Sequence, residues 1–364
     1  MSSFSTSSSS SNYNNGNSCN YNKDLLVKTG DLQIPTSYGH LSAKTWGTDG
    51  EDRLRVLAVH GWQDNAGTFN RLFPLLDHLN RLYIVALDLP GHGRSSHLPK
   101  GVPYTDMTWV IELKRTIDYL GWNGLSSSSA SSSASSFLNQ PQTPKLPFPK
   151  KGVIIIAHSM GANAAVELAA LYPHLVHTLI MLDTVKLRVF PTENLAAEMG
   201  RAIEVFSNHE KNTAFRTTKP ILFDLERALS VIIETHGNGK LTKDAAVCLM
   251  ERAMQWTGRQ AGGDGKRGFA FLRDPRLICP VYRKFDAPQL LNYLSSIRCR
   301  LLIVRARDTH PMLRCPHEDQ FVEMYREHCE EFAFQAVDGD HYVHLTEAAK
   351  VAPYVNAFLR QLFD

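Results

Sequence analysis

One serine occupies the position that a nucleophile takes in a strand–turn–helix unit. Residues 157–161 read Ala-His-Ser-Met-Gly; they follow the apolar run 153–156 and precede a helix-like stretch. Such a turn holds the serine hydroxyl clear of the sheet, and it needs small residues two positions before and after the serine. Ala157, where glycine is usual, and Gly161 meet that need. Because short motifs also occur by chance, assigning Ser159 as a nucleophile depends on finding the groups that would activate it.

A histidine near the end of the chain is suited to be that activating base. A serine hydroxyl is a weak nucleophile at neutral pH and needs a base, usually a histidine that a carboxylate orients. His341 follows the glycine-containing segment 337–340, between the last predicted strand and the final helix, where this base is expected. His344 is the competitor, and we expect it to start the final helix or to line the substrate pocket.

Two aspartates are candidates for the orienting carboxylate. Asp308 lies just past the predicted strand 300–305, and Asp183 ends the predicted strand 178–182. An acid at either strand end could reach the far nitrogen of His341, so both remain open. We favour Asp308, although it could instead be a turn residue beside two arginines. Asp183 could instead cap the segment that follows it.

Two backbone N–H groups are candidates for stabilising the negative charge that develops on a substrate carbonyl. Met160, directly after the serine, supplies one. The loop 60–64 (His-Gly-Trp-Gln-Asp), which follows the predicted strand 54–59, supplies the other through Trp62. The residues expected to line the substrate pocket are Gly61, Gln63, His158 and His344.

The elements that must position these residues alternate between strand and helix. Buried, β-branched runs separated by helices predict a mostly parallel sheet with helices on both faces, an α/β fold. The predicted strands are 54–59, 83–88, 153–157, 178–182, 300–305 and 331–337. The predicted helices are 69–79, 107–120, 162–171 and 346–362.

The segment 185–298 breaks this alternation, and we expect it to be a helical lid. The lid is inserted after the strand 178–182, which we count as the sixth strand of the complete sheet. Its predicted helices are 193–206, 222–234, 243–254 and 287–297. A lid there would cover the strand ends, where open α/β sheets bind their ligands. The core of the protein is then divided into residues 23–184 and 299–364.

Two low-complexity tracts are expected to carry no chemistry. Residues 1–22 are almost all serine and asparagine, so they cannot bury enough apolar surface to fold and are predicted to be disordered. Residues 121–150 are rich in serine and proline and are predicted to be an insert in a surface loop, which costs little stability.

Composition excludes several classes of function. The net charge is only +3 and the basic residues are scattered, so no nucleic-acid partner is expected. No stretch approaches the length of a membrane span, and the N-terminus does not read as a secretory signal. The six cysteines show no zinc spacing, and no residue cluster has the spacing of metal ligands. We therefore expect reduced thiols, a cytoplasmic location and no metal or other cofactor.

Taken together and in this order, the motifs resemble those of the α/β-hydrolase superfamily. A narrower resemblance is to the serine hydrolase-like proteins, a group with animal members regarded as serine hydrolases. The segments that carry it are 60–66, 101–104, 182–184, 273–277 and 341–345. The resemblance implies an α/β-hydrolase fold and a small-molecule substrate. Some relatives lack an aspartate where Asp308 stands, which keeps Asp183 a candidate. The resemblance also allows a peroxisomal location, although residues 362–364 do not form a peroxisomal targeting signal.

These observations predict a lidded serine hydrolase that cleaves a carboxylic ester or thioester by acyl transfer. Ser159 in place of an aspartate argues against a haloalkane dehalogenase or epoxide hydrolase, which use a carboxylate nucleophile. Two other possibilities remain open. One is a catalytically silent hydrolase fold that binds a ligand or a protein. The other is a C–C bond hydrolase or perhydrolase that uses the same three residues.

Overall fold

The computed structural model describes most of the predicted hydrolase core and its insertion. The described residues are 27–123, 152–190, 192–214, 220–236, 240–257, 267–309 and 316–363. The Ser/Asn-rich tail 1–22 and nearly all of the predicted insert 121–150 therefore lie outside the described residues.

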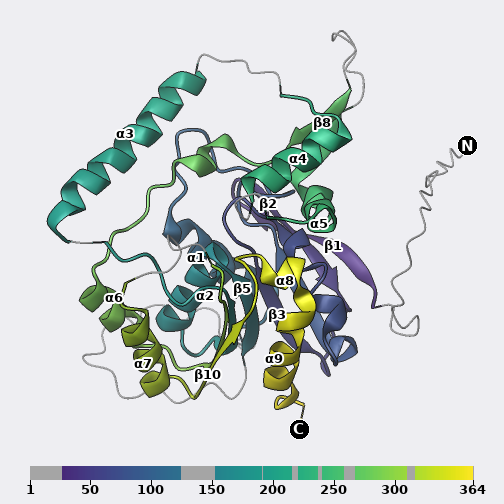
Figure 1. The fold of residues 1–364 in the computed structure, drawn as a ribbon, viewed down its shortest axis with the longest axis vertical. Helices are drawn as coiled ribbons and strands as arrows, with labels where there is room; N and C mark the ends of the chain where they lie inside the picture. Colours follow the sequence, from purple (N-terminus) through teal and green to yellow (C-terminus); the bar gives the residue numbers. More distant parts are fainter. Residues whose placement is uncertain are drawn as a thin grey trace, which may run out of the picture.

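An eight-stranded sheet runs through the described chain in the order β1-β2-β4-β3-β5-β6-β9-β10 (Figure 1). β2 is antiparallel to both of its neighbours, and all other neighbours are parallel. The strands are β1 (Thr29–Thr36), β2 (Gly39–Trp46), β3 (Leu54–Val59), β4 (Leu82–Leu87), β5 (Val153–His158), β6 (Val176–Leu182), β9 (Arg300–Ala306) and β10 (Glu331–Val337). The predicted mostly parallel sheet is confirmed, whereas β1 and β2 were not predicted.

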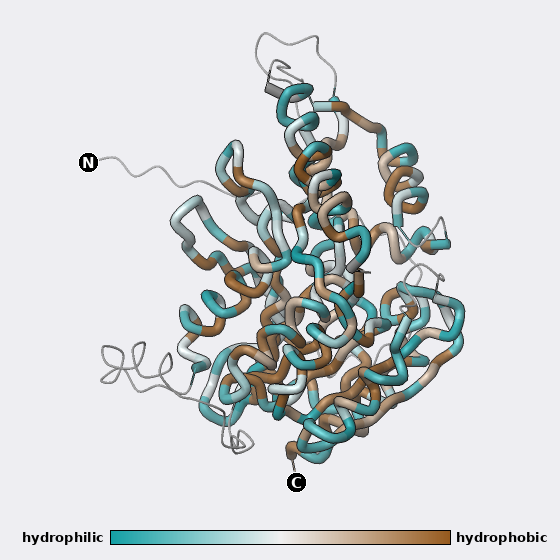
Figure 2. The backbone as a smooth tube through the Cα atoms, turned by 90° about the vertical axis from the view of Figure 1, so that its left-hand side faces the viewer, coloured by the Kyte–Doolittle hydropathy of each residue, from teal (hydrophilic) through white to brown (hydrophobic). Residues whose placement is uncertain are grey.

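The central strands are buried on both faces because alternate side chains enter two different cores. In β5, Ile155 and Ala157 join one core, while Ile154 and Ile156 join the other. A strand covered on both sides needs no polar alternation, which explains its continuous apolar sequence. Figure 2 agrees with this, because the segments made of hydrophobic residues gather in the interior of the molecule.

Helices cover both faces of this sheet. The first core contains side chains from α1 (Asp106–Tyr119), α2 (Met160–Leu171), α6 (Ala287–Leu294) and α7 (Glu318–His328). The second contains those from α9 (Ala348–Arg360) and from the segment after β3. The predicted helix 346–362 corresponds to α9, and a separate short helix, α8 (Val343–Thr346), directly precedes it.

The predicted helix 69–79 is wrong. Three 3₁₀ turns occupy this segment, at Ala66–Phe69, Phe73–Leu75 and Leu79–Arg81. Pro74 lies in the second turn, and proline removes a backbone donor that a continuous α-helix would use. Phe69 and Phe73 still stack, with ring centroids 5.0 Å apart, so the apolar pattern reflects core packing rather than a helix.

Residues 183–299, which we call the insertion, connect β6 to β9. Besides α6 they form α3 (Leu195–Ala214), α4 (Leu225–Thr235), α5 (Lys243–Ala253) and a two-stranded sheet, β7 (Met254–Thr257) with β8 (Gly268–Phe271). All four predicted helices are present, and the small sheet is an addition. Figure 1 shows α3 apart from α4 and α5. Side chains of α4 and α5 form one core with Tyr342 and Leu345, so this part of the insertion packs beside His341.

Candidate active site

Ser159 lies between the end of β5 and the start of α2, in a strained turn. Its φ is 51° and its ψ −119°, a conformation that costs a non-glycine residue about 1–3 kcal/mol. Gly161 permits the turn, because a Cβ there would lie 2.4 Å from the carbonyl oxygen of His60. Ala157 is fully buried in β5. The turn holds the Ser159 side chain at the carboxyl edge of the sheet, partly exposed.

His341 connects Ser159 to a carboxylate through both of its ring nitrogens. Its Nε2 is 2.9 Å from Ser159 Oγ, and its Nδ1 is 2.6 Å from Asp183 Oδ2. The carboxylate accepts a hydrogen bond from the Nδ1–H, which leaves the lone pair of Nε2 facing the serine hydroxyl. This is the arrangement in which a histidine acts as the general base for a serine.

Asp183 directly follows β6 and has four hydrogen-bond donors around its carboxylate. Oδ1 accepts from the Ala306 backbone N–H at 2.9 Å and from Arg305 Nη1 at 3.1 Å. Oδ2 accepts from Thr309 Oγ1 and from His341 Nδ1, both at 2.6 Å. The backbone φ of 50° at Asp183 turns the residue into this position. Such a donor set favours the ionised form of the carboxyl group.

The preference for Asp308 over Asp183 is corrected by this geometry. Asp308 stands two residues beyond the end of β9 and is exposed, and its backbone N–H donates to Gly339 O at 3.0 Å. Within the described residues, the carboxylate that contacts His341 belongs to Asp183. β6 and β9 are adjacent parallel strands, so both aspartates lie at the same edge of the sheet, and the local backbone selects between them.

The predicted oxyanion donors lie on the two segments that meet beside Ser159. Met160 is the first residue of α2, so its backbone N–H has no partner within the helix. Gly61 lies against the serine, because a Cβ on it would be 3.2 Å from Ser159 Cβ. The adjacent Trp62 is 45% exposed, and the next residue, Gln63, has a left-handed φ of 59°. A carbonyl bound at Ser159 would therefore lie close to both segments.

Two neutral histidines support the loop that carries Trp62. His60 accepts from the Leu89 N–H and donates to Gly61 O, and burial lowers its pKa to about 4. His92 accepts from the Gln63 N–H at 3.1 Å and donates to Pro90 O at 3.0 Å. Burial also lowers the pKa of His92. Each ring uses both nitrogens, which fixes its tautomer and holds the loop.

His158 and His344 lie behind the proposed triad rather than at a solvent-facing wall. Both are completely buried, which corrects the expectation that they line the substrate pocket. His158 Nε2 is 2.9 Å from the backbone oxygen of His341, and the His158 and His344 rings are 4.2 Å apart. His344 Nε2 is 2.9 Å from Thr68 Oγ1. These two histidines therefore pack behind His341 and do not face a bound substrate.

The insertion contacts both residues that were predicted to supply the oxyanion N–H groups. The Trp62 indole donates to Leu277 O at 2.8 Å, and Tyr282 donates to Met160 Sδ at 3.9 Å. Burial raises the pKa of Tyr282, so it remains a neutral donor. The insertion thus contacts the carboxyl edge of the sheet close to Ser159.

A second contact fixes the insertion to the sheet. Arg252, at the end of α5, is fully buried, and its Nε donates to Asp88 Oδ2 at 2.9 Å. Asp88 also accepts from the backbone N–H groups of Ala66 at 2.8 Å and Arg94 at 2.9 Å. Asp88 is therefore a structural anchor for the loop it begins.

Sequence reasoning missed Arg305 and Thr309 as supports of Asp183. Both follow from the position of β9 beside β6, because they lie at its carboxyl end and just beyond it. A predicted strand order could have placed them there. Residue type alone gave no such signal.

No group of three or more histidine, cysteine, aspartate or glutamate side chains in the described ranges is arranged to hold a metal ion. Likewise, none of the described helices is long and apolar enough to cross a membrane.

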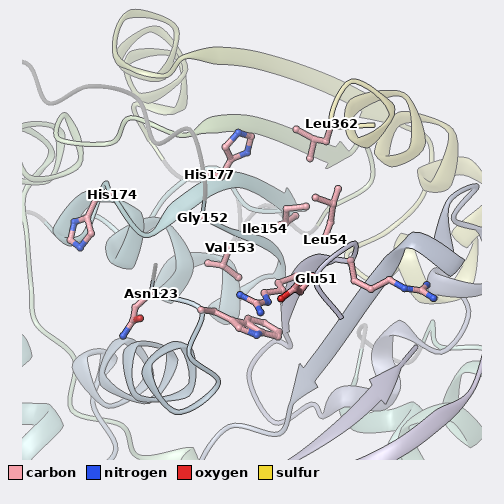
Figure 3. Close-up of a pocket in the computed structure, with 12 residues that line it drawn as sticks. Glu51, Leu54, Asn123, Gly152, Val153, Ile154, His174, His177 and Leu362 are labelled. Carbon is pink, nitrogen blue, oxygen red and sulfur yellow. The ribbon is translucent and has the colours of Figure 1, made fainter. Parts of the chain in front are cut away.

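A hollow of about 540 Å³ is lined by Leu54, Val153 and His177, among others (Figure 3). These residues lie where β3, β5 and β6 begin, at the opposite edge of the sheet from Ser159.

Comparison with known proteins agrees with this geometry. Residues 56–353 match the model of the alpha/beta hydrolase family. The chain is 28% identical over 333 residues to "Probable serine hydrolase" of Drosophila melanogaster, covering 91% of this chain and 88% of that protein. It is also 28% identical over 340 residues to human "Serine hydrolase-like protein 2", covering 91% and 94%.

A solved structure shows the same fold. The crystal structure of a hypothetical protein from Pseudomonas aeruginosa PAO1 matches with a TM-score of 0.69 at 24% identity, covering 92% of this chain and 99% of that one. The family match covers most of β3, all of β4, β5, β6, β9 and β10, the Ser159 turn and the His341 loop. The resemblance to the serine hydrolase-like proteins is confirmed, and the chain belongs to the alpha/beta hydrolase family.

Proposed function

We propose that this protein is a serine hydrolase that cleaves a carboxylic ester or thioester through an acyl-serine intermediate. The observation that carries the proposal is the continuous hydrogen-bonded chain from Asp183 through His341 to Ser159. Partial exposure of Ser159 and His341 gives substrate access to this chain.

The first half of the reaction forms the acyl-enzyme. His341 Nε2 removes the Ser159 hydroxyl proton as Oγ attacks the substrate carbonyl carbon. The carbonyl oxygen takes up the electron pair and accepts hydrogen bonds from the Met160 and Trp62 backbone N–H groups. The intermediate then collapses, and His341 donates its proton to the departing alcohol or thiol.

The second half uses the same groups with water. His341 removes a proton from water, the hydroxide attacks the acyl carbon, and Ser159 Oγ leaves with the proton that His341 returns. Asp183 keeps the Nδ1–H of His341 in place and stabilises the imidazolium that forms twice in each turnover. The four donors around Asp183 keep it ionised for this purpose.

The test is hydrolysis of p-nitrophenyl esters and acyl-CoA thioesters of graded chain length by the wild type and Ser159→Ala. We expect turnover in the wild type and a fall of roughly 10³- to 10⁶-fold in the variant. A fluorophosphonate should label Ser159, as located by peptide mass spectrometry. Ser230→Ala, on α4, is the matched control and should be labelled and active as the wild type is.

Undiminished hydrolysis by Ser159→Ala would refute the mechanism. Absence of both turnover and labelling in the wild type would instead favour a binding protein with a hydrolase fold. Among active substrates, the preferred chain length and the ratio of oxygen to sulfur esters would define the substrate class.

A further inference from the structure

His158 has one ring nitrogen in use and one without a partner. Its Nε2 lies 2.9 Å from the backbone oxygen of His341, and a carbonyl oxygen can only accept. Nε2 must therefore carry a hydrogen. In a neutral imidazole this leaves Nδ1 as a lone pair, and Nδ1 has no hydrogen-bond partner although the ring is completely buried.

Asp64 faces this unpartnered nitrogen. Its Oδ2 is 4.0 Å from His158 Nδ1 and is itself buried without a hydrogen-bond partner. Its other oxygen, Oδ1, accepts from the Asn65 N–H at 2.8 Å. If Asp64 were a carboxylate and His158 neutral, two lone pairs would face each other, and each would lack the partner that a buried polar atom requires. One additional proton removes both defects.

The surroundings place that proton on Asp64. Burial raises the pKa of Asp64 to about 7; hydrogen bonds from Asn65 and Thr68 oppose this rise, and the negative charge of Asp88 adds to it. Burial lowers the pKa of His158, and the neighbouring His344 and His341 lower it further.

The buried phenol of Tyr342 also interacts with Asp64, and burial raises the pKa of this phenol. It is therefore neutral at the same pH. A neutral acid beside a neutral imidazole is thus the arrangement that buries no unpaired charge.

We propose that Asp64 is a neutral carboxylic acid whose O–H donates a hydrogen bond to Nδ1 of His158, and that this pair positions His341 through its backbone carbonyl. The proposal requires a side-chain rotation that would close the 4.0 Å separation to hydrogen-bond distance. Asp64 and His158 are positioning residues, since neither is placed to touch the substrate. The catalytic consequence rests on the proposed serine hydrolase mechanism.

Two substitutions of Asp64 show whether His158 needs a neutral hydrogen-bond donor or a negative charge at this position. In Asp64→Asn the amide can still donate to His158 Nδ1 and accept from Asn65, so we expect kcat within about twofold of the wild type. Asp64→Leu removes the donor and should lower kcat about tenfold with little change in KM, the effect of one lost hydrogen bond. An Asp64→Asn variant as impaired as Asp64→Leu would overturn the proposal.

The pH dependence of unfolding tests the neutral acid without any catalytic readout. The pKa of Asp64 is raised in the folded state, so its stabilising effect is complete below the unfolded pKa of about 3.9 and disappears as the pH rises through about 7. Relative to Asp64→Asn, the unfolding equilibrium constant of the wild type should rise about tenfold per pH unit between pH 5 and pH 7, measured with urea.

A pH-independent ratio would overturn the proposal. If a fluorophosphonate does not label the wild type, the proposed function is refuted. The pH dependence of unfolding would then still test the protonation state of Asp64. The unfolding comparison also decides the matter if Asp64→Leu does not fold.

Discussion

Asp183 and Asp64 both support His341, and they differ in the hydrogen bonds that reach them. Asp183 contacts the His341 ring directly and accepts from four donors. Asp64 acts through His158 on the His341 backbone; the Asn65 N–H and the Thr68 hydroxyl donate to it, and its Oδ2 is left without a partner. Both side chains are fully buried. The difference therefore lies in the donors and not in the depth of burial.

This contrast indicates how one fold holds one carboxyl group ionised and another neutral. Four donors replace the water that a carboxylate loses on burial, so the negative charge of Asp183 is retained. Two donors that leave Oδ2 without a partner cannot do this for Asp64, and the proton supplies the missing interaction. Asp88, with two backbone donors and the Arg252 guanidinium, belongs to the same class as Asp183.

The largest effect should come from Asp183→Asn. The amide cannot compensate an imidazolium and tends to hold His341 in the wrong tautomer, so kcat should fall by about 10⁴-fold while the protein remains folded. Asp308→Asn is the matched control, because Asp308 is exposed, and its kcat should change by less than about twofold. Steady-state kinetics on one ester, with circular dichroism to check folding, would decide; a greater loss in Asp308→Asn would reverse the assignment.

The next largest effect should be on stability, in Arg252→Gln. Removing the guanidinium leaves Asp88 buried without its countercharge, which should lower the free energy of unfolding by about 3–5 kcal/mol. Urea unfolding at pH 7 measures this change. Arg227→Gln, on the exposed side of α4, is the control and should unfold as the wild type does. Equal stabilities of the two variants would show that Asp88 does not depend on Arg252.

A smaller effect is expected from Thr309→Val, which removes one of the four donors to Asp183. The loss of one hydrogen bond to a charged group should lower kcat roughly 10- to 100-fold and leave KM unchanged. Thr309→Ser keeps the hydroxyl and should recover most of the activity. If the valine and serine variants have the same kcat, Asp183 does not need its fourth donor. The two aspartates would then differ less in the hydrogen bonds they require than we propose.

The sequence predicted those parts of the molecule that local pattern determines. The turn at Ser159 could be identified because small residues and an apolar strand are adjacent in the chain, and β5, β6 and β9 because their residues are buried on both faces. The 3₁₀ turns near Pro74 and the hairpin of β1 and β2 were missed. β1 is an edge strand with mostly exposed side chains, so it lacks the apolar run that marks the central strands.

The site was predictable only where a residue's role depends on its neighbours in the chain. Choosing between Asp183 and Asp308 requires the backbone turn after β6 and the register of β6 against β9. The pairing of Asp64 with His158 joins residues 94 positions apart, and nothing in either local sequence indicates it. Tertiary contacts that set protonation states are therefore the part that sequence patterns did not reveal.

The position of β9 between β6 and β10 also sets the order in which the active site can be assembled during synthesis. Ser159 and Asp183 are made early, but the side chains and backbone groups that hold Asp183 come from residues 305–309, and the base is residue 341. Because domains emerge from the ribosome N-terminus first, a growing chain carries an ordinary serine hydroxyl until its last two strands join the sheet. Under the proposed mechanism, Ser159 would therefore gain its reactivity only when these strands have joined the sheet.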